Sequence, residues 1–315
     1  MNPDQRIFIA GHNGMVGSAC HRFLQNRGWT HIITASHDEL DLCNAGETFA
    51  FLQNQKPAIV INAAARVGGI HANQSYPAEF LQSNLAIGLN LVEGSRRAGV
   101  KRLLNLGSTC IYPREAPQPI PEEALLTGPL ESTNEGYAIA KIATLKLCQT
   151  YRQQYGLLYH SAMPTNLYGP GDNYHPENSH VLPALLRRFH EAAQKESPAV
   201  KVWGTGKAQR EFLHVDDLAA AVFHLLHLED PPDWVNIGTG KDCTIAELAK
   251  LIAATVGYSG KIEFDPSRPD GTPRKVCDIQ KIKATGWSPK ISLVDGLLQT
   301  YQNFRQSLQT NSLRK

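Results

Sequence analysis

Apolar runs alternate with longer amphipathic stretches through the first half of the chain. The apolar runs have the length of buried strands, and the amphipathic stretches have the spacing and length of helices. The expected strands are residues 6–11, 31–35, 58–65, 100–108 and 159–169, and the expected helices are residues 15–28, 45–55, 77–99 and 134–156. Strands that alternate with helices in this way are typical of a parallel sheet covered by helices on both faces. The pattern therefore predicts an α/β fold with a doubly wound parallel sheet.

This alternation stops soon after the fifth expected strand. Residues 169–180, GPGDNYHPENSH, have the composition of a long loop. A strand and a helix are expected again over residues 210–228, followed by a strand within 234–240. The expected domains are a Rossmann-type domain of residues 1–170 to which residues 210–240 return, and a smaller C-terminal cap of residues 171–209 and 241–315.

The composition of the chain indicates an ordinary globular protein. Hydrophobic residues make up 42% of the 315 residues and charged residues 19%, and the formal net charge is +2. This charge does not indicate a nucleic-acid partner, and no apolar run approaches the length of a membrane span. The six cysteines are widely spaced without a C-x-x-C pair, and the N-terminus enters a strand without a signal-peptide pattern. These features predict a cytoplasmic protein with reduced thiols. His175 and His180 have no supporting ligand cluster, so no metal site is predicted.

Three glycines follow the first expected strand at G-x-x-G-x-x-G spacing. Gly11, Gly14 and Gly17 lie between the apolar run RIFIA and an expected helix. The early glycines permit a tight turn and close approach of the backbone to a pyrophosphate, and the last permits close packing of helix and strand. The N-terminus of the helix offers free N–H groups and the positive end of its dipole to that anion. In this position the motif predicts a dinucleotide site.

The end of the second expected strand leaves the choice of dinucleotide open. An acidic residue there would bind a ribose 2′-hydroxyl, whereas a basic residue would bind a 2′-phosphate. Ser36 and His37 precede Asp38, so both interpretations stand, and Asp38 is equally compatible with a turn or a helix cap. Asp41 is a candidate for a position near the adenine.

Tyr137 and Lys141 lie four residues apart in the last expected helix of the first half, so they share one helix face. Alone, this spacing is also that of an ordinary amphipathic helix. Ser108 ends an expected strand, and strand C-terminal ends are where sheets of this type bind ligands. A hydroxyl, a phenol and an ammonium form a proton-transfer set for a carbonyl. We predict that the Lys141 ammonium, about 4 Å away at an effective dielectric constant of about 20, lowers the pKa of Tyr137 by roughly three units.

The glycine pattern, Ser108 and the Tyr-x-x-x-Lys pair together resemble the extended short-chain dehydrogenase/reductases. Further stretches, among them GSTCIYP, YAIAK, MPTNLYGP, REFLHVDD and PDGTPRK, are similar to the GDP-L-fucose synthase family over nearly the whole chain. The resemblance implies a two-step enzyme with NADP(H) as its cofactor. Its expected substrate is GDP-4-keto-6-deoxy-D-mannose, which is inverted at C3 and C5 and then reduced at the C4 ketone. It also implies a homodimer, an NADP-binding Rossmann domain and a cap that binds the GDP-sugar.

The resemblance assigns catalytic roles to five residues. It implies that Tyr137 donates the proton to the C4 oxygen, Ser108 hydrogen-bonds that oxygen, and Lys141 tunes Tyr137 and holds the nicotinamide ribose. Cys110 and His180 match the acid/base pair of the epimerisation. Carbons next to a ketone are acidic enough for this chemistry when the enolate oxygen is stabilised. From residue type alone, Cys110 is also compatible with a small buried hydrophobic position and His180 with a solvated loop position.

Cofactor and substrate contacts are expected at further positions that match the family. The expected cofactor-binding residues are Gly11, His12, Asn13, Gly14, Met15, Val16, Gly17, His37, Asp38, Asp41, Leu106, Gly107, Lys141, Pro164, Thr165, Asn166, Leu167 and His180. The expected substrate-binding residues are Arg188, Trp203, Arg210 and Asp270. Arginine suits a pyrophosphate because its planar fork donates two parallel hydrogen bonds. The alternatives are a solvated helix position for Arg188, a core position for Trp203 and a turn for Asp270.

Two positions depart from the family pattern. Members often carry arginine where this chain has Asn13, and a basic residue near His37. The loss of both would remove favourable charge at a 2′-phosphate. We therefore expect a preference for NADPH over NADH that is weaker than in relatives with arginine.

Other functions are compatible with parts of the pattern. A nucleotide-sugar 4-epimerase of the same superfamily would retain its NAD and show no net reduction. A 4,6-dehydratase usually has an Asp-Glu pair where this chain has Cys110 and Ile111, which argues against it. A redox sensor that binds NADP without catalysis tends to lose the tyrosine or the lysine, and both are present here.

Overall fold

The computed structural model describes residues 1–176, 178–268 and 270–314. Its centre is a six-stranded parallel sheet with the strand order β2-β1-β3-β4-β5-β9. The strands are β1 (Ile7–Ala10), β2 (Ile32–Ile33), β3 (Ile59–Asn62), β4 (Arg102–Leu106), β5 (Leu158–Pro164) and β9 (Trp234–Ile237). The chain passes from β1 to β2 on one side and returns to β3 on the other, so the carboxyl ends of β1 and β3 flank the crevice where such sheets bind ligands. The predicted doubly wound α/β fold is confirmed.

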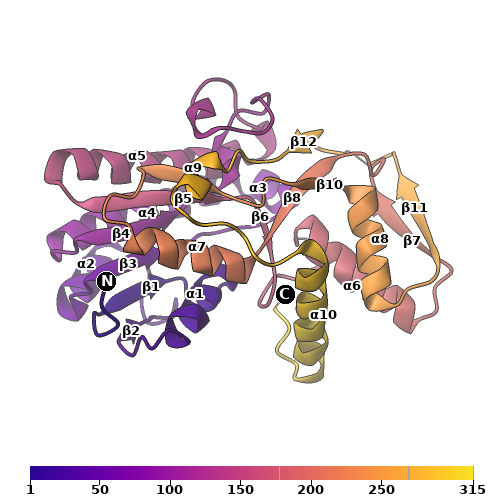
Figure 1. Cartoon of the computed structure of the whole chain (residues 1–315), viewed down its shortest axis with the longest axis horizontal. Helices are drawn as coiled ribbons and strands as arrows, with labels where there is room; N and C mark the ends of the chain where they lie inside the picture. The colour runs from indigo at the N-terminus through magenta and orange to yellow at the C-terminus, as the bar shows by residue number, and fades with distance from the viewer. Residues whose placement is uncertain (177, 269, 315) are drawn as a thin grey trace.

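Helices cover both faces of this sheet (Figure 1). On one face α1 packs against α7, and on the other α4 packs against α2 and α5. The bounds are α1 (Met15–Gln25), α2 (Ala45–Gln55), α4 (Pro77–Arg97), α5 (Glu135–Tyr155) and α7 (Val215–His227). The short helix α3 (Ile70–Ser75) leads into α4, and α9 (Gln280–Ala284) packs beside β9. The four helices expected in the first half of the chain are therefore confirmed.

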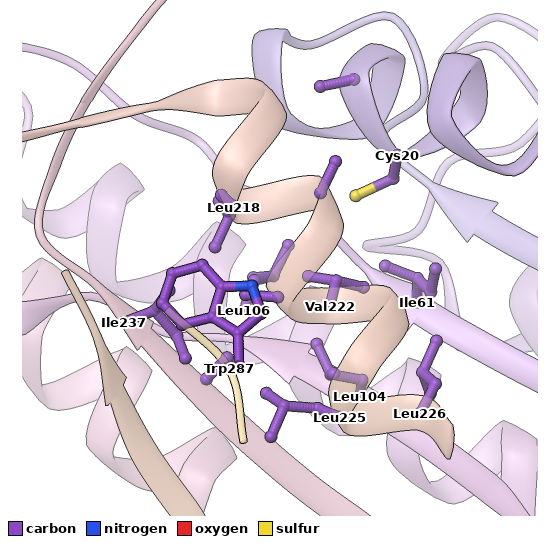
Figure 2. Packing of buried hydrophobic residues seen from close by; sticks show 14 of the residues in the cluster. Cys20, Ile61, Leu104, Leu106, Leu218, Val222, Leu225, Leu226, Ile237 and Trp287 are labelled. Atoms are coloured by element: carbon purple, nitrogen blue, oxygen red, sulfur yellow. The ribbon is translucent and has the colours of Figure 1, made fainter. Parts of the chain in front are cut away.

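The alternation of apolar side chains along the strands explains this two-faced packing. In β1, Ile7 and Ile9 join the core under α1 and α7, whereas Phe8 and Ala10 join the core under α2 and α4. The first of these cores is shown in Figure 2, where α7 lies across the ends of side chains from several strands. The labelled members include Leu218, Val222, Leu225 and Leu226 of α7, Ile61 of β3, Leu104 and Leu106 of β4, and Ile237 of β9.

A second packing unit lies at the opposite end of the long axis of the molecule (Figure 1). It contains α6 (Val181–Gln194), α8 (Ile245–Val256), α10 (Leu293–Gln309) and a two-stranded parallel sheet of β7 (Ala199–Trp203) and β11 (Lys261–Asp265). α8 packs against both α6 and α10. The buried core of this unit includes Leu186, Phe189, Leu248, Ile252 and Phe304.

A small sheet around β8 joins the two parts. β8 (Gln209–His214) pairs with β6 (Asn166–Tyr168), β10 (Asp242–Thr244) and β12 (Arg274–Lys275). Glu211 of β8 is fully buried, and its carboxylate accepts backbone hydrogen bonds from Thr239 (2.5 Å), Gly240 (2.6 Å) and Cys277 (2.9 Å). These bonds fix the turn after β9 to the segment that follows β12.

Several elements differ from the sequence-based expectations. The expected strand of residues 159–169 is divided, because β6 leaves the large sheet to pair with β8. Within the returning segment 210–240, β9 joins the large sheet and α7 packs on one face of it, whereas β8 belongs to the small sheet. Helix α6 follows the expected loop; it was not among the expected elements, although the alternative for Arg188 was a helix position. The assignment of domains at the stated bounds stays a prediction. Within the described ranges, no helix is both long enough and apolar enough to cross a membrane.

Candidate active site

Ser108, Tyr137 and Lys141 lie together at the carboxyl end of β4. Ser108 follows that strand closely, Tyr137 lies in the first turn of α5, and Lys141 lies one turn later on the same face. The Ser108 hydroxyl lies near the Tyr137 phenol and lowers its pKa. The Lys141 ammonium lies 5.7 Å from the centre of the Tyr137 ring. The fold therefore assembles the three groups, and their catalytic roles stay a prediction.

Lys141 is held in one place by burial and by a backbone carbonyl. Its side chain is buried, with 6% of the residue exposed, and its Nζ donates a hydrogen bond to the carbonyl oxygen of Leu106 at 2.9 Å. Burial lowers the pKa of Lys141 from its ordinary value of 10.5 to about 8, because desolvation disfavours the charged amine. At neutral pH the ammonium therefore keeps its proton.

The pKa of Tyr137 is shifted in the direction opposite to the prediction. Burial of the phenol raises its pKa well above the ordinary value, the nearby Cys110 adds to this increase, and the Ser108 hydroxyl lowers it. Part of the Tyr137 surface remains accessible to solvent, as expected for a side chain that lines a concave site. The Lys141 ammonium bonds to the Leu106 carbonyl and does not compensate for the desolvation. Tyr137 is therefore a protonated phenol at neutral pH, which is the form a proton donor needs.

Cys110 lies in the short 3-10 helix η1 (Thr109–Ile111), two residues after Ser108. Its backbone N–H donates a hydrogen bond to the Ser108 hydroxyl at 3.2 Å. Its half-buried sulfur receives donors from Asn134 (Nδ2, 3.3 Å) and Lys275 (Nζ, 3.8 Å). The sequence pointed to Cys110 but not to these two neighbours, because Lys275 is 165 residues away along the chain. The only signal for Lys275 was its position in the family-like stretch PDGTPRK.

A cavity of about 350 Å³ opens beside Tyr137. Its walls come from α3, the start of α4, the 3-10 helix η3 (Ser132–Asn134) and the first turn of α5. The Oδ1 atoms of Asn73 and Asn134, two of the residues that line it, are buried and have no hydrogen-bond partner among the described residues. Unpaired buried acceptors are costly unless a donor satisfies them. The cavity is therefore suited to a ligand with hydroxyl groups, such as a sugar.

His180 occupies the N-cap position of α6. Its ring is exposed, but the protein around it desolvates the imidazole and lowers its pKa below the ordinary value. The segment before it contacts the start of α3, where the Gly69 N–H donates to the carbonyl oxygen of Asn178 at 3.3 Å. Because α3 also packs on η3, His180 lies on a segment that borders the same region of the molecule. No hydrogen bond joins His180 to Cys110 in the described structure.

The glycine motif forms a tight loop between β1 and α1. Gly11 has a positive φ of 81°, and a Cβ atom there would lie 2.7 Å from the Cα of Ala64 at the end of β3. Gly14 is the N-cap of α1 and makes no side-chain cap, so N–H groups of the first turn are available to an anion. The Nδ1 atom of His12 is buried and lacks a partner within the described structure. These features fit the phosphates of a dinucleotide at the crevice between β1 and β3.

Replacement of Gly17 by alanine is expected to disrupt this loop. The added Cβ would collide with the carbonyl oxygen of Gly11, which is backbone and has no room to move. We expect a loss of at least about tenfold in NADPH affinity and a lower melting temperature, measured by fluorescence titration and thermal denaturation. Gly46→Ala is the matched control, because its Cβ would meet only the Asn44 side chain at 3.4 Å in the first turn of α2. Unchanged NADPH affinity in Gly17→Ala would contradict the assignment of the loop.

The remaining predicted cofactor-binding residues lie near the carboxyl ends of the central strands. Asn13, His37 and Asp38 are exposed, and the Asp41 carboxylate accepts a hydrogen bond from the Cys43 N–H at 2.9 Å, as in a turn. The others lie at the start of α1 (Met15, Val16), at the end of β4 (Leu106, Gly107) and along the crossing from β5 to β6 (Pro164, Thr165, Asn166, Leu167). Their contacts with a cofactor stay predictions.

The four predicted substrate-binding residues form two pairs, and the members of each pair lie close to each other. Trp203 is 59% exposed, and the Arg188 guanidinium lies 5.9 Å from the centre of its ring. Both line a surface hollow of about 320 Å³. Arg210 lies close to the loop that carries Asp270, whose carboxylate accepts hydrogen bonds from the Thr205 N–H and hydroxyl, each at 2.7 Å. Trp203 is thus not a core residue, and Asp270 ties its loop to Thr205, 65 residues away along the chain.

Comparisons with known proteins agree with this geometry. A model of the NAD dependent epimerase/dehydratase family matches residues 7–238. GDP-L-fucose synthase 1 of Arabidopsis thaliana is 57% identical over 94% of this chain and 92% of its own length. GDP-L-fucose synthase of Escherichia coli (strain K12) is 52% identical over 96% of this chain and 97% of its own length. The solved structure of MlghC, a GDP-mannoheptose C4 reductase from Campylobacter jejuni with NADP bound, superposes with a TM-score of 0.90 at 35% identity, over 97% of this chain and 99% of that chain.

Proposed function

We propose that this chain, which belongs to the NAD dependent epimerase/dehydratase family, converts GDP-4-keto-6-deoxy-D-mannose to GDP-L-fucose. The cofactor of this reaction is NADP(H), and the reaction inverts C3 and C5 and then reduces the C4 ketone. The observation that carries the proposal is the grouping of Ser108, Tyr137 and Lys141 beside Cys110, at the carboxyl edge of a sheet whose first loop fits a dinucleotide.

Epimerisation requires proton removal from a carbon next to the C4 ketone. Ser108 and Tyr137 are placed to donate hydrogen bonds to the ketone oxygen, which stabilises the enolate formed when the proton leaves. Cys110 and His180 are the proposed acid/base pair that removes a proton from one face and returns one to the other.

Reduction requires a proton for the C4 oxygen as hydride reaches the carbon. NADPH supplies the hydride when it is bound. Tyr137 donates the proton, and its raised pKa keeps the phenol protonated for this step. Lys141, held by the Leu106 carbonyl below the Tyr137 ring, stabilises the phenolate that remains and is placed to contact the nicotinamide ribose.

Two further properties belong to this proposal. We propose a homodimer formed through α4 and α5, which is supported by the exposed apolar side chains of Leu89 and Ile139 on those helices. We also propose a cytoplasmic location, for which the support is that all six cysteines are free thiols. The exposed Asn13 and His37 give little positive charge for a 2′-phosphate, so the preference for NADPH over NADH is proposed to be modest.

The test is NADPH consumption by the purified protein with GDP-4-keto-6-deoxy-D-mannose, with the product identified by NMR. GDP-L-fucose as the product would support both chemical stages. A sugar reduced at C4 with unchanged C3 and C5 would leave a plain reductase and would remove the roles of Cys110 and His180. No NADPH consumption, together with tightly bound NAD, would favour the 4-epimerase alternative.

The pH dependence of the reduction is expected to follow Lys141. Its folded-state pKa is about 8, so kcat/KM for NADPH-dependent reduction should fall as the pH rises through about 8, because the ammonium is lost. Stability should change in the other direction. Between about pH 8 and 10.5 the unfolded chain holds a proton on this lysine that the folded chain has released, so this group makes unfolding less favourable as the pH rises.

The two trends separate a catalytic loss from unfolding. Initial rates and urea midpoints are measured on the same samples between pH 6.5 and roughly 9.5. A decrease in rate that is matched by a falling urea midpoint would contradict the assignment to Lys141, and so would a rate that stays constant across this interval.

A further inference from the structure

The sulfur of Cys110 is surrounded by donors from two distant parts of the chain. The Asn134 amide, at the N-cap of α5, approaches it at 3.3 Å, and the Lys275 ammonium, at the end of β12, approaches it at 3.8 Å. A neutral thiol is a weak acceptor, whereas a thiolate is a strong one and is favoured by a nearby cation. The arrangement therefore matches the charged form of this cysteine.

The backbone before and after Lys275 is held in place by hydrogen bonds. β12 pairs in parallel with β8 at Gln209 and Arg210, so the strand that ends in Lys275 is part of a sheet. The next residue, Val276, donates its N–H to the Gln118 side chain at 3.0 Å and accepts a hydrogen bond from the Ile120 N–H at 2.8 Å. Glu211 then accepts the Cys277 N–H. The side chain starts from a rigid position, and its approach to Cys110 is a built feature of the fold.

Besides Cys110, the charge of Lys275 acts on the buried Cys277 thiol, where it opposes the rise in pKa that burial causes. Lys275 is half-buried, and none of the described carboxylates forms an ion pair with it. Its neighbour Arg274, in contrast, pairs with Asp242 on the opposite side of the strand. The other ionisable side chains whose charges interact with Cys110 are Tyr137 and Lys141 of α5, and the Lys141 ammonium is already bound to the Leu106 carbonyl.

We propose that Lys275 is a positioning residue for the epimerisation, which stabilises negative charge on the Cys110 sulfur and thereby supports this cysteine as the base of that step. The inference rests on the proposed function, because it assigns the partner of a residue already placed in the reaction. It adds an electrostatic role for the segment 273–277, whose Lys275 ammonium approaches the Cys110 sulfur.

The chemistry is a proton transfer without a change of oxidation state. The thiolate of Cys110 forms an S–H bond with the proton of C3 or C5, and the electron pair of the broken C–H bond moves to the C4 oxygen as an enolate. The enolate then returns the pair to the carbon, which takes a proton from an acid on its opposite face. The thiol releases its proton to solvent, and the Lys275 ammonium stays protonated throughout.

The first test needs no substrate and measures alkylation of Cys110 by iodoacetamide as a function of pH, followed by mass spectrometry of the peptide that contains it. In Lys275→Met the midpoint of the alkylation profile should move up by about one to two pH units relative to the wild type, because a cation within about 4 Å has been removed. Lys275→Arg should keep most of the shift. Lys283→Met, at an exposed position of α9, is the matched control and should behave as the wild type.

The second test follows deuterium incorporation at C3 and C5 of GDP-4-keto-6-deoxy-D-mannose in D₂O at pH 7. Lys275→Met should reduce this exchange about tenfold or more and recover part of the rate at higher pH, a recovery that a purely structural defect would not show. An unchanged alkylation profile in folded Lys275→Met protein would overturn the proposal even if the wild type makes GDP-L-fucose. A shifted profile in a protein that makes no GDP-L-fucose would instead refute the proposed function and leave the Lys275–Cys110 interaction standing.

Discussion

Tyr137→Phe is expected to lower the rate of NADPH-dependent reduction by about 10²–10⁴-fold, because it removes the phenol that we propose as the proton donor to the C4 oxygen. The ring itself remains, so the Lys141 ammonium keeps its position near the aromatic face. NADPH binding should change little. The measurement is single-turnover NADPH oxidation at saturating GDP-4-keto-6-deoxy-D-mannose, with cofactor affinity determined separately by fluorescence titration.

Tyr155→Phe is the matched control for this variant. Tyr155 ends the same helix and is 45% exposed, so the removal of its hydroxyl group should leave the reduction rate within about twofold of the wild type. Deuterium exchange at C3 and C5 should persist in Tyr137→Phe, since Ser108 still donates to the ketone oxygen. A reduction rate within tenfold of the wild type in Tyr137→Phe would remove Tyr137 from the mechanism.

Cys110→Ser is expected to stop the epimerisation while the reduction continues. A serine hydroxyl in place of the thiol is a far weaker acid, so it forms almost no anion at neutral pH, and proton removal from C3 and C5 should fall by about 10²-fold or more. The product would then be a GDP-sugar reduced at C4 with unchanged configuration at C3 and C5. NMR of the product mixture and deuterium incorporation in D₂O measure the two stages independently.

The control for this variant is Cys43→Ser, an exposed cysteine in the segment that precedes α2. It should yield GDP-L-fucose at the wild-type rate. If Cys110→Ser also incorporated deuterium at the wild-type rate, the base of the epimerisation would have to be another group, and the proposed role of Lys275 would lose its target.

The sequence predicted most of the large sheet and its helices because those elements follow simple periods. Ile7 and Ile9 against Phe8 and Ala10 show the period of two that a two-sided strand produces. β6 was not separated from β5, because no turn signal lies between them and the change of sheet depends on pairing with β8. Helix α6 was not among the expected elements, although Leu182, Leu185, Leu186 and Phe189 have helical spacing, because it follows a Gly/Pro-rich loop and contains Pro183.

The structure brings three predicted site residues together, but their electrostatics differ from the prediction. Ser108, Tyr137 and Lys141 were grouped correctly from motif spacing, but the sign of the Tyr137 pKa shift was wrong. The prediction counted the attraction of the ammonium and omitted the cost of desolvating a phenolate, and it placed the ammonium at the phenol oxygen. In the structure that ammonium donates to the Leu106 carbonyl instead. The contact between Lys275 and Cys110 depends on tertiary structure and has no local sequence signal.

The order of the strands has a consequence for protein engineering. β9 is the edge strand of the large sheet beside β5, and α7 covers one face of that sheet. Both follow α6 and β7 of the second unit in the chain (Figure 1). A chain cut after β6 would lack both elements. The side chains of Leu104 and Leu106 in β4, which pack in the same core as α7 and β9, would then be exposed to solvent (Figure 2). The second unit can therefore be exchanged between relatives only as two inserts, with residues 210–240 retained between them as the block that completes the large sheet.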